Sequence, residues 1–329
     1  MNWNGKRVLV TGAGGFIGSH LTEELVKSGA SVRGMVHYNS RNDWGQIERL
    51  PKDIQDNLEV FTGDVQDPFS VQKAVKDCDV VFHLAALIAI PYSYIAPASY
   101  VATNVSGTLN VMQACLTEGV SKVVHTSTSE TFGTALYTPI DEKHPLQGQS
   151  PYSASKIGAD KIAESYYLSF SLPVATIRPF NTYGPRQSAR AVIPTIISQA
   201  LTRDFVKLGS LTPVRDLNFV KDTANGFIKI AESENSVGQL INIGFGKGIT
   251  IGDLAVKIGQ LLNKELDIKT DEIRIRPDKS EVMELICANQ KAKDVVGWSP
   301  QYTLEQGLTE TIKFVEKNLD MYKPDIYNV

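Results

Sequence analysis

The chain has 329 residues, 21% of them charged and 42% hydrophobic, with a formal net charge of −3. This is typical of a soluble globular protein with one large domain or two closely packed ones, and the charge gives no reason to expect nucleic acid or an anionic membrane as a partner. Cys78, Cys115 and Cys287 are far apart in the chain, so neither a disulfide framework nor a metal site is indicated.

The longest apolar run, residues 80–90, contains His83 and is too short to span a bilayer. A strand-like segment begins at Arg7, which leaves no room for a signal peptide. We therefore expect a cytoplasmic protein with no membrane segment.

Short β-branched runs alternate with helical patterns through the first half of the chain. Strands are predicted at 7–11, 31–36, 58–62, 80–84, 122–127 and 174–178. Helices are predicted at 17–28, 70–76, 98–119 and 151–171, the last with Ser150 as its N-cap and Pro151 as its first residue. This alternation predicts an α/β fold, a Rossmann-type doubly wound parallel sheet with helices on both faces.

The regular alternation of strands and helices ends after residue 178. Helices are predicted at 192–201, 223–232, 251–263 and 304–318, and a strand at 239–243 can return to the main sheet. We therefore predict a dinucleotide-binding domain over residues 1–178 and a smaller α/β domain over residues 179–329 whose chain interleaves with the first.

A glycine-rich turn joins the first predicted strand to the first helix. Gly12 suits a tight turn, Gly15 lets the backbone approach a pyrophosphate, and Gly18 permits close packing of helix on strand. The helix N-terminus attracts the negative charge of the pyrophosphate. Surface turns also need glycine, but the context of strand, turn and helix predicts a dinucleotide site.

The ends of the next two strands bear on the identity of the dinucleotide. Asp64 follows the third strand, where its carboxylate can accept a hydrogen bond from an adenine amino group or merely form a turn. The second strand ends at His37, with Asn39 and Arg41 beyond it. It carries neither the acid that usually binds the NAD ribose nor an arginine pair for a 2′-phosphate. NAD is favoured, and NADP stays an alternative.

Tyr152 and Lys156 lie four residues apart on one face of a predicted helix. A nearby ammonium favours a phenolate, so Tyr152 is predicted to act as a base near neutral pH. Thr128, Ser129 and Glu130 precede them and supply hydroxyls and a carboxylate. Dehydration of a sugar requires one group to help oxidise an alcohol and another to remove a carbon-bound proton.

Taken together, these features resemble the extended short-chain dehydrogenases/reductases, a family of NAD-dependent nucleotide-sugar epimerases and dehydratases. The matching motifs are Thr-Gly-Ala-Gly-Gly-Phe-Ile-Gly at 11–18, Gly-Asp-Val at 63–65, His-Leu-Ala-Ala at 83–86, Asn-Val-Ser-Gly-Thr at 104–108, Ser-Thr at 127–128, Tyr-Ser-Ala-Ser-Lys at 152–156, Arg-Pro-Phe-Asn at 178–181 and Arg-Asp at 215–216. They occur in the order of the family and cover most of the chain.

The resemblance implies specific roles. Thr128 and Tyr152 would hold the sugar hydroxyl, and Lys156 would bind the nicotinamide ribose and keep Tyr152 acidic. The residues implied at the cofactor are Gly12, Gly15, Phe16, Ile17, Gly18, His37, Asn39, Arg41, Asp64, Val65, Leu84, Ala85, Ala86, Asn104, Tyr152 and Lys156. Those implied at the nucleotide sugar are Ser93, Asn181, Arg190, Arg215 and Arg276, and a surface or ion-pair role is the alternative for each arginine.

Position 130 distinguishes branches of this family. Simple 4-epimerases resemble Ser-Ser-Ala-Thr-Val-Tyr-Gly here, whereas residues 127–133 read Ser-Thr-Ser-Glu-Thr-Phe-Gly. Glu130 matches the carboxylate with which 4,6-dehydratases remove the C5 proton; alternatively it caps a helix or faces solvent. Ser129 replaces the aspartic acid of dTDP-glucose dehydratases but matches GDP-mannose dehydratases, in which the glutamate can act as both base and acid.

The implied reaction oxidises C4 with Tyr152 as base, removes the C5 proton with Glu130, expels water from C6 and returns the hydride to C6. NAD would stay tightly bound and be recycled at each turnover. The sequence as a whole looks most like those of UDP-N-acetylglucosamine 4,6-dehydratases of legionaminic and pseudaminic acid pathways. Alternatives are a C4 or C5 epimerase of a UDP-sugar, an enzyme that oxidises C4 and reprotonates C5 of a 5,6-ene, and a non-catalytic dinucleotide sensor. The resemblance also implies a homodimer through a four-helix bundle formed by 98–119 and 151–171.

Overall fold

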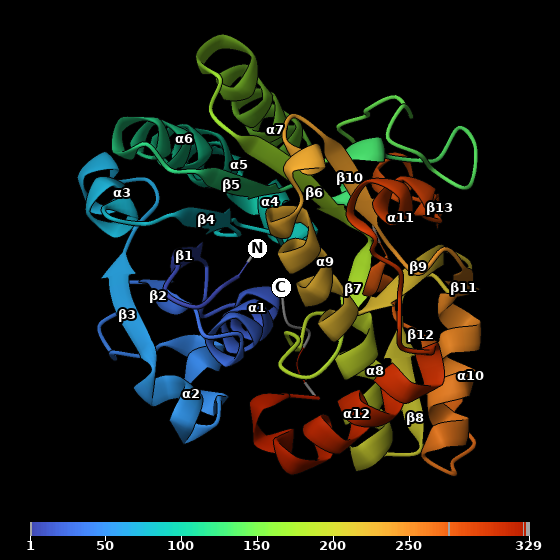
Figure 1. Cartoon of the computed structure of the whole chain (residues 1–329). Coiled ribbons are helices and arrows are strands. Elements are labelled where there is room, and N and C mark those ends of the chain that lie inside the picture. The colour runs from blue at the N-terminus through green and yellow to red at the C-terminus, as the bar shows by residue number, and fades with distance from the viewer. Residues whose placement is uncertain (1, 276, 325, 327–329) are drawn as a thin grey trace.

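The computed structural model describes residues 2–275, 277–324 and 326. Within these residues the main sheet has seven strands in the order β10-β6-β5-β4-β1-β2-β3, and every pairing is parallel (Figure 1). The strands are β1 (Arg7–Thr11), β2 (Ser31–His37), β3 (Leu58–Gly63), β4 (Val80–His83), β5 (Lys122–Thr126), β6 (Val174–Pro179) and β10 (Leu240–Ile243). The predicted doubly wound α/β fold is confirmed.

Helices cover both faces of this sheet (Figure 1). One face carries α1 (Phe16–Lys27) and α9 (Val220–Glu232), and the other carries α3 (Pro68–Val75), α6 (Gly107–Glu118) and α7 (Pro151–Phe170). Alternate strand residues enter the two cores: Val8 and Val10 pack with α1 and α9, whereas Leu9 packs with α3, α6 and α7. Burial on both faces explains why these strands are almost wholly apolar.

The start of α7 follows from its local sequence. The Ser153 amide donates to Ser150 Oγ at 3.1 Å, and the Ser150 amide donates to Ser153 Oγ at 3.0 Å, which satisfies both ends of a capping box. Pro151 occupies the first turn, where its missing N–H leaves no bond unmade. The predicted helix start is therefore confirmed, and it sets Tyr152 at the first turn of α7.

The helix predicted over 98–119 is interrupted. The chain forms α5 (Pro97–Tyr100), then a wider π-helical segment at Val101–Ser106, and only then α6. Asn104 lies in the wide segment and bonds back to the loop after β4: its Oδ1 accepts from the Leu87 amide at 2.8 Å, and its Nδ2 donates to the Leu87 carbonyl at 3.0 Å. A tertiary contact of this kind overrides the regular helical period.

The second half of the chain forms a smaller α/β part beside the carboxyl ends of the sheet (Figure 1). Strand β9 (Val214–Phe219) pairs with β7 (Asn181–Tyr183), β11 (Gly248–Thr250) and β13 (Glu284–Leu285), while β8 (Phe205–Leu208) pairs with β12 (Asp267–Thr270). Its helices are α8 (Val192–Thr202), α10 (Ile251–Leu261) and α12 (Leu304–Lys317). Their apolar faces share one core with β8 and β9.

The segment expected to return to the main sheet forms β10, which pairs with β6. The short helices α2 (Lys52–Asp56), α4 (Ile90–Ile95) and α11 (Gln290–Val296) are additions to the predicted elements. The division into domains at residue 178 stays a prediction. Among the described residues, no helix combines the length and apolarity needed to cross a bilayer.

Candidate active site

A cavity of about 1230 Å³ lies at the carboxyl ends of β1 to β6, between the main sheet and the smaller part. Ligands of open α/β sheets bind at this edge. The volume exceeds the 300–1,000 Å³ typical of a site for one drug-sized molecule. The cavity can therefore hold two ligands, for example a dinucleotide and a nucleotide sugar.

The glycine-rich turn forms one end of the cavity and leaves no room for side chains. Gly12 has φ +72°, and a Cβ there would lie 2.9 Å from the Ala85 amide nitrogen. A Cβ at Gly18 would overlap the Gly12 carbonyl. Helix α1 begins after Gly15, and no side chain caps it, so no capping side chain bonds its first backbone amides at the cavity end of the helix. These features fit the diphosphate of a dinucleotide.

The loop after β2 provides no obvious carboxylate at the strand end. Asn39 Oδ1 accepts from the backbone amides of Arg41 and Asp43 at 3.1 Å each, so the amide oxygen serves the loop itself. The Arg41 side chain is 82% exposed and lies 3.6 Å from Asp43. Asp43 also lines the cavity. Sequence reasoning missed this acid because it stands six residues beyond the strand.

At the end of β3, Asp64 forms a turn, and its predicted contact with adenine stays a prediction. Its carboxylate lines the cavity, and its Oδ1 also accepts from the Gln66 amide at 2.9 Å as a turn former does. His37 Nε2 lies 3.4 Å from Asp64 Oδ2. Further predicted cofactor residues that line the cavity are Gly12, Gly15, Phe16, Ile17, Gly18, Val65, Leu84, Ala85 and Ala86.

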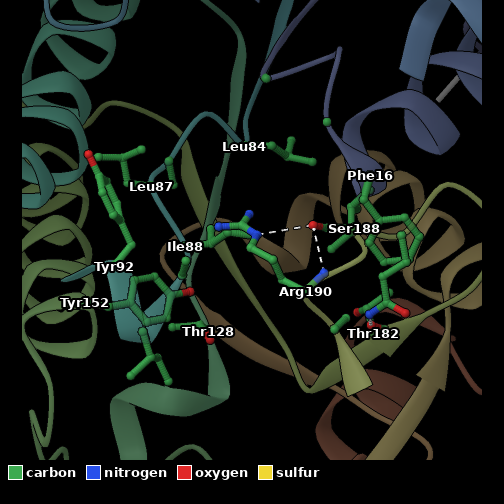
Figure 2. Close-up of a pocket in the computed structure, with 18 of the residues that line it drawn as sticks. Phe16, Leu84, Leu87, Ile88, Tyr92, Thr128, Tyr152, Thr182, Ser188 and Arg190 are labelled. Atoms are coloured by element: carbon green, nitrogen blue, oxygen red, sulfur yellow. Dashed lines mark hydrogen bonds between the residues drawn. The ribbon is translucent and has the colours of Figure 1, made fainter. Parts of the chain in front are cut away.

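The predicted catalytic residues meet in this cavity. Helix α7 brings Tyr152 close to Thr128, and Figure 2 shows the two side chains adjacent. Thr128 caps a single helical turn, Ser129–Phe132, by accepting from the Glu130 amide at 3.3 Å. Ser129, Glu130 and Lys156 also line the cavity. The arrangement therefore puts a phenol, hydroxyls, an amine and a carboxylate around one space.

The protein's own residues do not give Tyr152 the lowered pKa that its spacing from Lys156 predicted. Burial raises the pKa of Tyr152, and the negative charges of Glu130 and Asp160 raise it further, against the hydrogen bond from Thr128. The pKa of Lys156 is lowered by burial, against the charge of Asp160, and its Nζ donates to the Thr126 carbonyl at 2.6 Å. Burial therefore opposes the phenolate that the spacing of Tyr152 and Lys156 predicted.

Two predicted ligands lie outside the cavity lining. Ser93 is fully buried, and its hydroxyl donates to the Ile90 carbonyl at 2.6 Å, so its predicted contact with substrate does not agree with the structure. Asn104 is also buried and bonds Leu87 and, at 2.9 Å, Ser155 Oγ. It supports the site rather than facing a ligand. Tyr100, which sequence reasoning missed, packs edge-on against Tyr152.

The smaller part supplies the remaining wall. The Oδ1 atom of Asn181 is buried and has no hydrogen-bond partner among the described residues, and Asn181 lines the cavity. Arg190 extends into the cavity with its Nε 3.2 Å from Ser188 Oγ (Figure 2). Arg215 lines it too and pairs with Glu281 at 3.2 Å. Arg276 lies outside the described residues.

In the described part of the chain, no group of three or more His, Cys, Asp or Glu residues is arranged to hold a metal ion. The groups that converge on the cavity are instead those of proton transfer and anion binding.

Comparison with known proteins adds the family context. Residues 9–311 match the family described as GDP-mannose 4,6 dehydratase. The UDP-glucose 4-epimerase of Mycolicibacterium smegmatis is 32% identical, over 94% of this chain and 98% of that protein. The dTDP-glucose 4,6-dehydratase of Streptomyces antibioticus is 31% identical, over 96% of this chain and 94% of that protein.

Two solved structures are similar over nearly their whole length. The UDP-N-acetylglucosamine 4-epimerase of Methanobrevibacter ruminantium in complex with UDP-N-acetylmuramic acid has a TM-score of 0.87 and 31% identity, covering 95% of this chain and 99% of that one. The dTDP-glucose 4,6-dehydratase DesIV of Streptomyces venezuelae, with NAD bound, has a TM-score of 0.85 and 26% identity, covering 97% and 99%.

Proposed function

Because this chain belongs to the GDP-mannose 4,6-dehydratase family of extended short-chain dehydrogenases/reductases, we propose that it is an NAD-dependent 4,6-dehydratase of a UDP-N-acetylhexosamine, with UDP-N-acetylglucosamine as the expected substrate. The family includes nucleotide-sugar 4,6-dehydratases and 4-epimerases. One observation carries the choice between them: the carboxylate of Glu130 lines the cavity beside Tyr152.

The proximity of the two groups has a chemical meaning. The charge of Glu130 raises the pKa of Tyr152, which requires the carboxylate and the phenol to be near neighbours. A dehydratase needs two acid–base groups for adjacent carbons of one sugar, whereas oxidation and reduction at C4 alone need only the phenol. A carboxylate at this position therefore favours removal of the C5 proton.

The residues divide the steps as follows. When bound, the oxidised cofactor supplies the hydride acceptor and a positively charged ring. Tyr152 takes the proton of the C4 hydroxyl, which Thr128 helps to orient, and Lys156 supplies a cation to the same pocket. Once C4 is a ketone the C5 hydrogen is acidic, and Glu130 removes it. Glu130 then gives this proton to the departing C6 hydroxyl, which leaves as water, with Ser129 orienting the group because a serine hydroxyl is too weak an acid for the whole task. The resulting 5,6-alkene would regain at C6 the hydride removed from C4 and at C5 a proton that Glu130 takes up from solvent, which gives the 4-keto-6-deoxy sugar.

Several features support a UDP-N-acetylhexosamine. The loop from Leu87 to Pro91 gives the cavity an apolar wall that suits an acetamido methyl group. Arg190 and Arg215 also line the cavity and suit a diphosphate, and the unpartnered Asn181 oxygen suits a donor on the sugar nucleotide. A related epimerase 31% identical to this chain was solved with UDP-N-acetylmuramic acid.

The second candidate is 4-epimerisation of a UDP-sugar, which the 32% identity to a UDP-glucose 4-epimerase favours. Incubation with UDP-N-acetylglucosamine in deuterated water separates the two. A dehydratase yields a 4-keto-6-deoxy sugar with deuterium at C5, whereas a 4-epimer without solvent deuterium would refute dehydration. Turnover of a 5,6-ene sugar, with no reaction of UDP-N-acetylglucosamine itself, would instead support C4 oxidation with C5 reprotonation.

Glu130→Gln tests the assigned base directly. The variant is expected to lose C5 deuterium incorporation and product formation by about a hundredfold or more, while the absorbance of reduced cofactor still appears on mixing with substrate. Loss of the Glu130 charge also lets Tyr152 ionise at lower pH, so this first absorbance change should extend to lower pH. Glu164→Gln, an exposed residue of α7, serves as the matched control. Dehydration by Glu130→Gln at the control rate would contradict the role.

We further propose a homodimer built from α6 and α7. Leu109 on α6 is 42% exposed, and Leu168 and Phe170 on α7 are 71% and 54% exposed, which is costly for large apolar side chains in water. Light scattering should give twice the 36.1 kDa mass of the chain. Leu168→Glu combined with Phe170→Glu should give the monomer, and an unchanged dimer would point to another interface.

A further inference from the structure

The face of α7 that carries Tyr152 and Lys156 continues with a third polar residue. Asp160 lies one turn beyond Lys156, as Lys156 lies one turn beyond Tyr152. Asp160 is only 7% exposed and stands behind the cavity rather than in its lining. A buried carboxylate requires partners, and those of Asp160 come from other elements.

The Asp160 carboxylate joins α7 to two strands of the sheet. Its Oδ1 lies 2.9 Å from His125 Nε2 on β5, and its Oδ2 accepts from Arg178 Nη2 on β6 at 2.9 Å. The hydroxyl of Ser127 donates to the same Oδ2 and accepts from Arg178 Nε at 3.0 Å. Ser127 directly precedes Thr128, so the network fixes the strand end from which Thr128 projects.

The same network reaches the turn that carries Glu130. The Arg178 guanidinium lies 4.5 Å from the ring centroid of Phe132, the last residue of that turn. A guanidinium at this distance is attracted by the face of the ring. One buried ion pair thus contacts both the helix of Tyr152 and the turn of Glu130.

Asp160 also influences the charge of the buried amine of Lys156, which lies one turn earlier on the same helix. Burial lowers the pKa of Lys156, and Asp160 is the group whose charge opposes that effect. The other titratable or charged groups facing this region are Tyr152 on α7, His83 on β4, His125 on β5, Arg178 on β6 and Glu130 on the turn after β5. Burial lowers the pKa of both His83 and His125, so these histidines stay neutral and add no competing positive charge.

We propose that Asp160 is a positioning residue of this active site, which places a negative charge one turn from Lys156 on α7 and fixes the end of β5 that carries Thr128. The inference rests on the proposed function only in that the reaction uses Tyr152, Lys156 and Thr128. The fold alone does not demand a carboxylate here, because a buried ion pair generally contributes little net stability compared with apolar residues of similar size.

The test compares three variants. Asp160→Asn keeps the shape and removes the charge. Asp160→Asn combined with Arg178→Gln removes both buried charges and so avoids leaving the guanidinium unpaired if the single variant fails to fold. Glu164→Gln, one turn further along α7 and 51% exposed, removes a carboxylate from the same helix without touching the network. Circular dichroism establishes that each is folded.

The first readout needs no ligand. Proteins labelled with ¹⁵N-lysine are titrated by NMR, with the Lys156 Nζ signal assigned by its loss in Lys156→Arg. Lys156 is expected to lose its proton at lower pH in both Asp160 variants and to titrate as in the wild type in Glu164→Gln. Wild-type titration of Lys156 in the folded Asp160 variants would overturn the proposal.

The second readout follows turnover of UDP-N-acetylglucosamine against pH. In both Asp160 variants kcat should fall by about tenfold or more, KM should change much less, and the basic limb of the profile should move to lower pH. A fall in kcat with an unmoved profile, or a loss that only follows the folded fraction, would show a purely structural residue and overturn the proposal. If the wild-type protein dehydrates no sugar nucleotide, the proposed function fails, and the lysine titration still decides the role of Asp160.

Discussion

Replacement of Gly12 by alanine tests the tightest contact of the dinucleotide cradle. The new Cβ would lie 2.9 Å from the Ala85 nitrogen and 3.0 Å from its Cα, whereas ordinary contact begins near 3.4 Å. Both partners are backbone, so the turn after β1 and the loop after β4 must separate by about 0.5 Å. The φ of +72° adds strain of about 1–2 kcal/mol for any L side chain.

A matched variant separates the two costs. Gly5 has φ +78°, and nothing lies within 4 Å of its would-be Cβ, so Gly5→Ala carries the strain without the contact. Gly12→Ala is expected to lose about 1–3 kcal/mol more of the free energy of unfolding in urea than Gly5→Ala does. Because the loops that move are the predicted NAD-binding loops, the Kd for NAD should rise at least tenfold, or about 1.4 kcal/mol.

Isothermal titration with NAD and urea unfolding followed by circular dichroism measure both effects. Gly5→Ala should bind NAD as the wild type does. Equal NAD affinity and equal stability in the two variants would refute the reasoning, because the close approach of Gly12 to Ala85 would then contribute neither to stability nor to NAD binding.

Two further predictions concern stability. Burial, and then the charge of Arg186, lower the pKa of His20 to about 3. The contribution of neutral His20 to the free energy of unfolding is therefore present above pH 6.5 and is lost below it, by up to about 1.4 kcal/mol per pH unit. In urea unfolding, the stability of His20→Gln should approach that of the wild type as pH falls from 7 to 4, and parallel pH profiles of the two proteins would contradict this. Ser150→Ala removes the N-cap of α7 and should lower the free energy of unfolding by about 1 kcal/mol, as Thr303→Ala should at the equivalent N-cap of α12. Only Ser150→Ala should also lower kcat, because α7 starts beside Tyr152. An equal effect of both variants on kcat would argue against a link between this N-cap and Tyr152.

Local signals predicted much of the fold. The apolar run at Val8, Leu9 and Val10 specifies a strand buried on both faces, and the structure divides these residues between two cores. Ser150 and Pro151 define a helix start from adjacent residues alone. The glycine turn is likewise local, because Gly12 and Gly18 meet within a single turn. Such features depend on neighbours in the chain and are readable from it.

The features that sequence reasoning missed depend on distant contacts. The π-helical segment arises where Asn104 bonds the loop at Leu87, 17 residues earlier. The orientation of Ser93 follows from the small helix α4, which has no strong local signal. The raised pKa of Tyr152 comes from burial, which spacing relative to Lys156 does not report. Asp160 shows both aspects: its place on the helix face is local, but its partners lie on β5 and β6.

The pairing of β10 with β6 has a consequence for the newly made chain. About 60 residues separate the end of β6 from the start of β10, so at 5–20 residues per second the ribosome needs roughly 3–12 s to supply the missing neighbour. Throughout that interval β6 is an open edge, able to pair with a foreign strand. Chaperone engagement or pausing during this window would therefore govern yield, and a chain halted near residue 178 should aggregate rather than accumulate as a stable half.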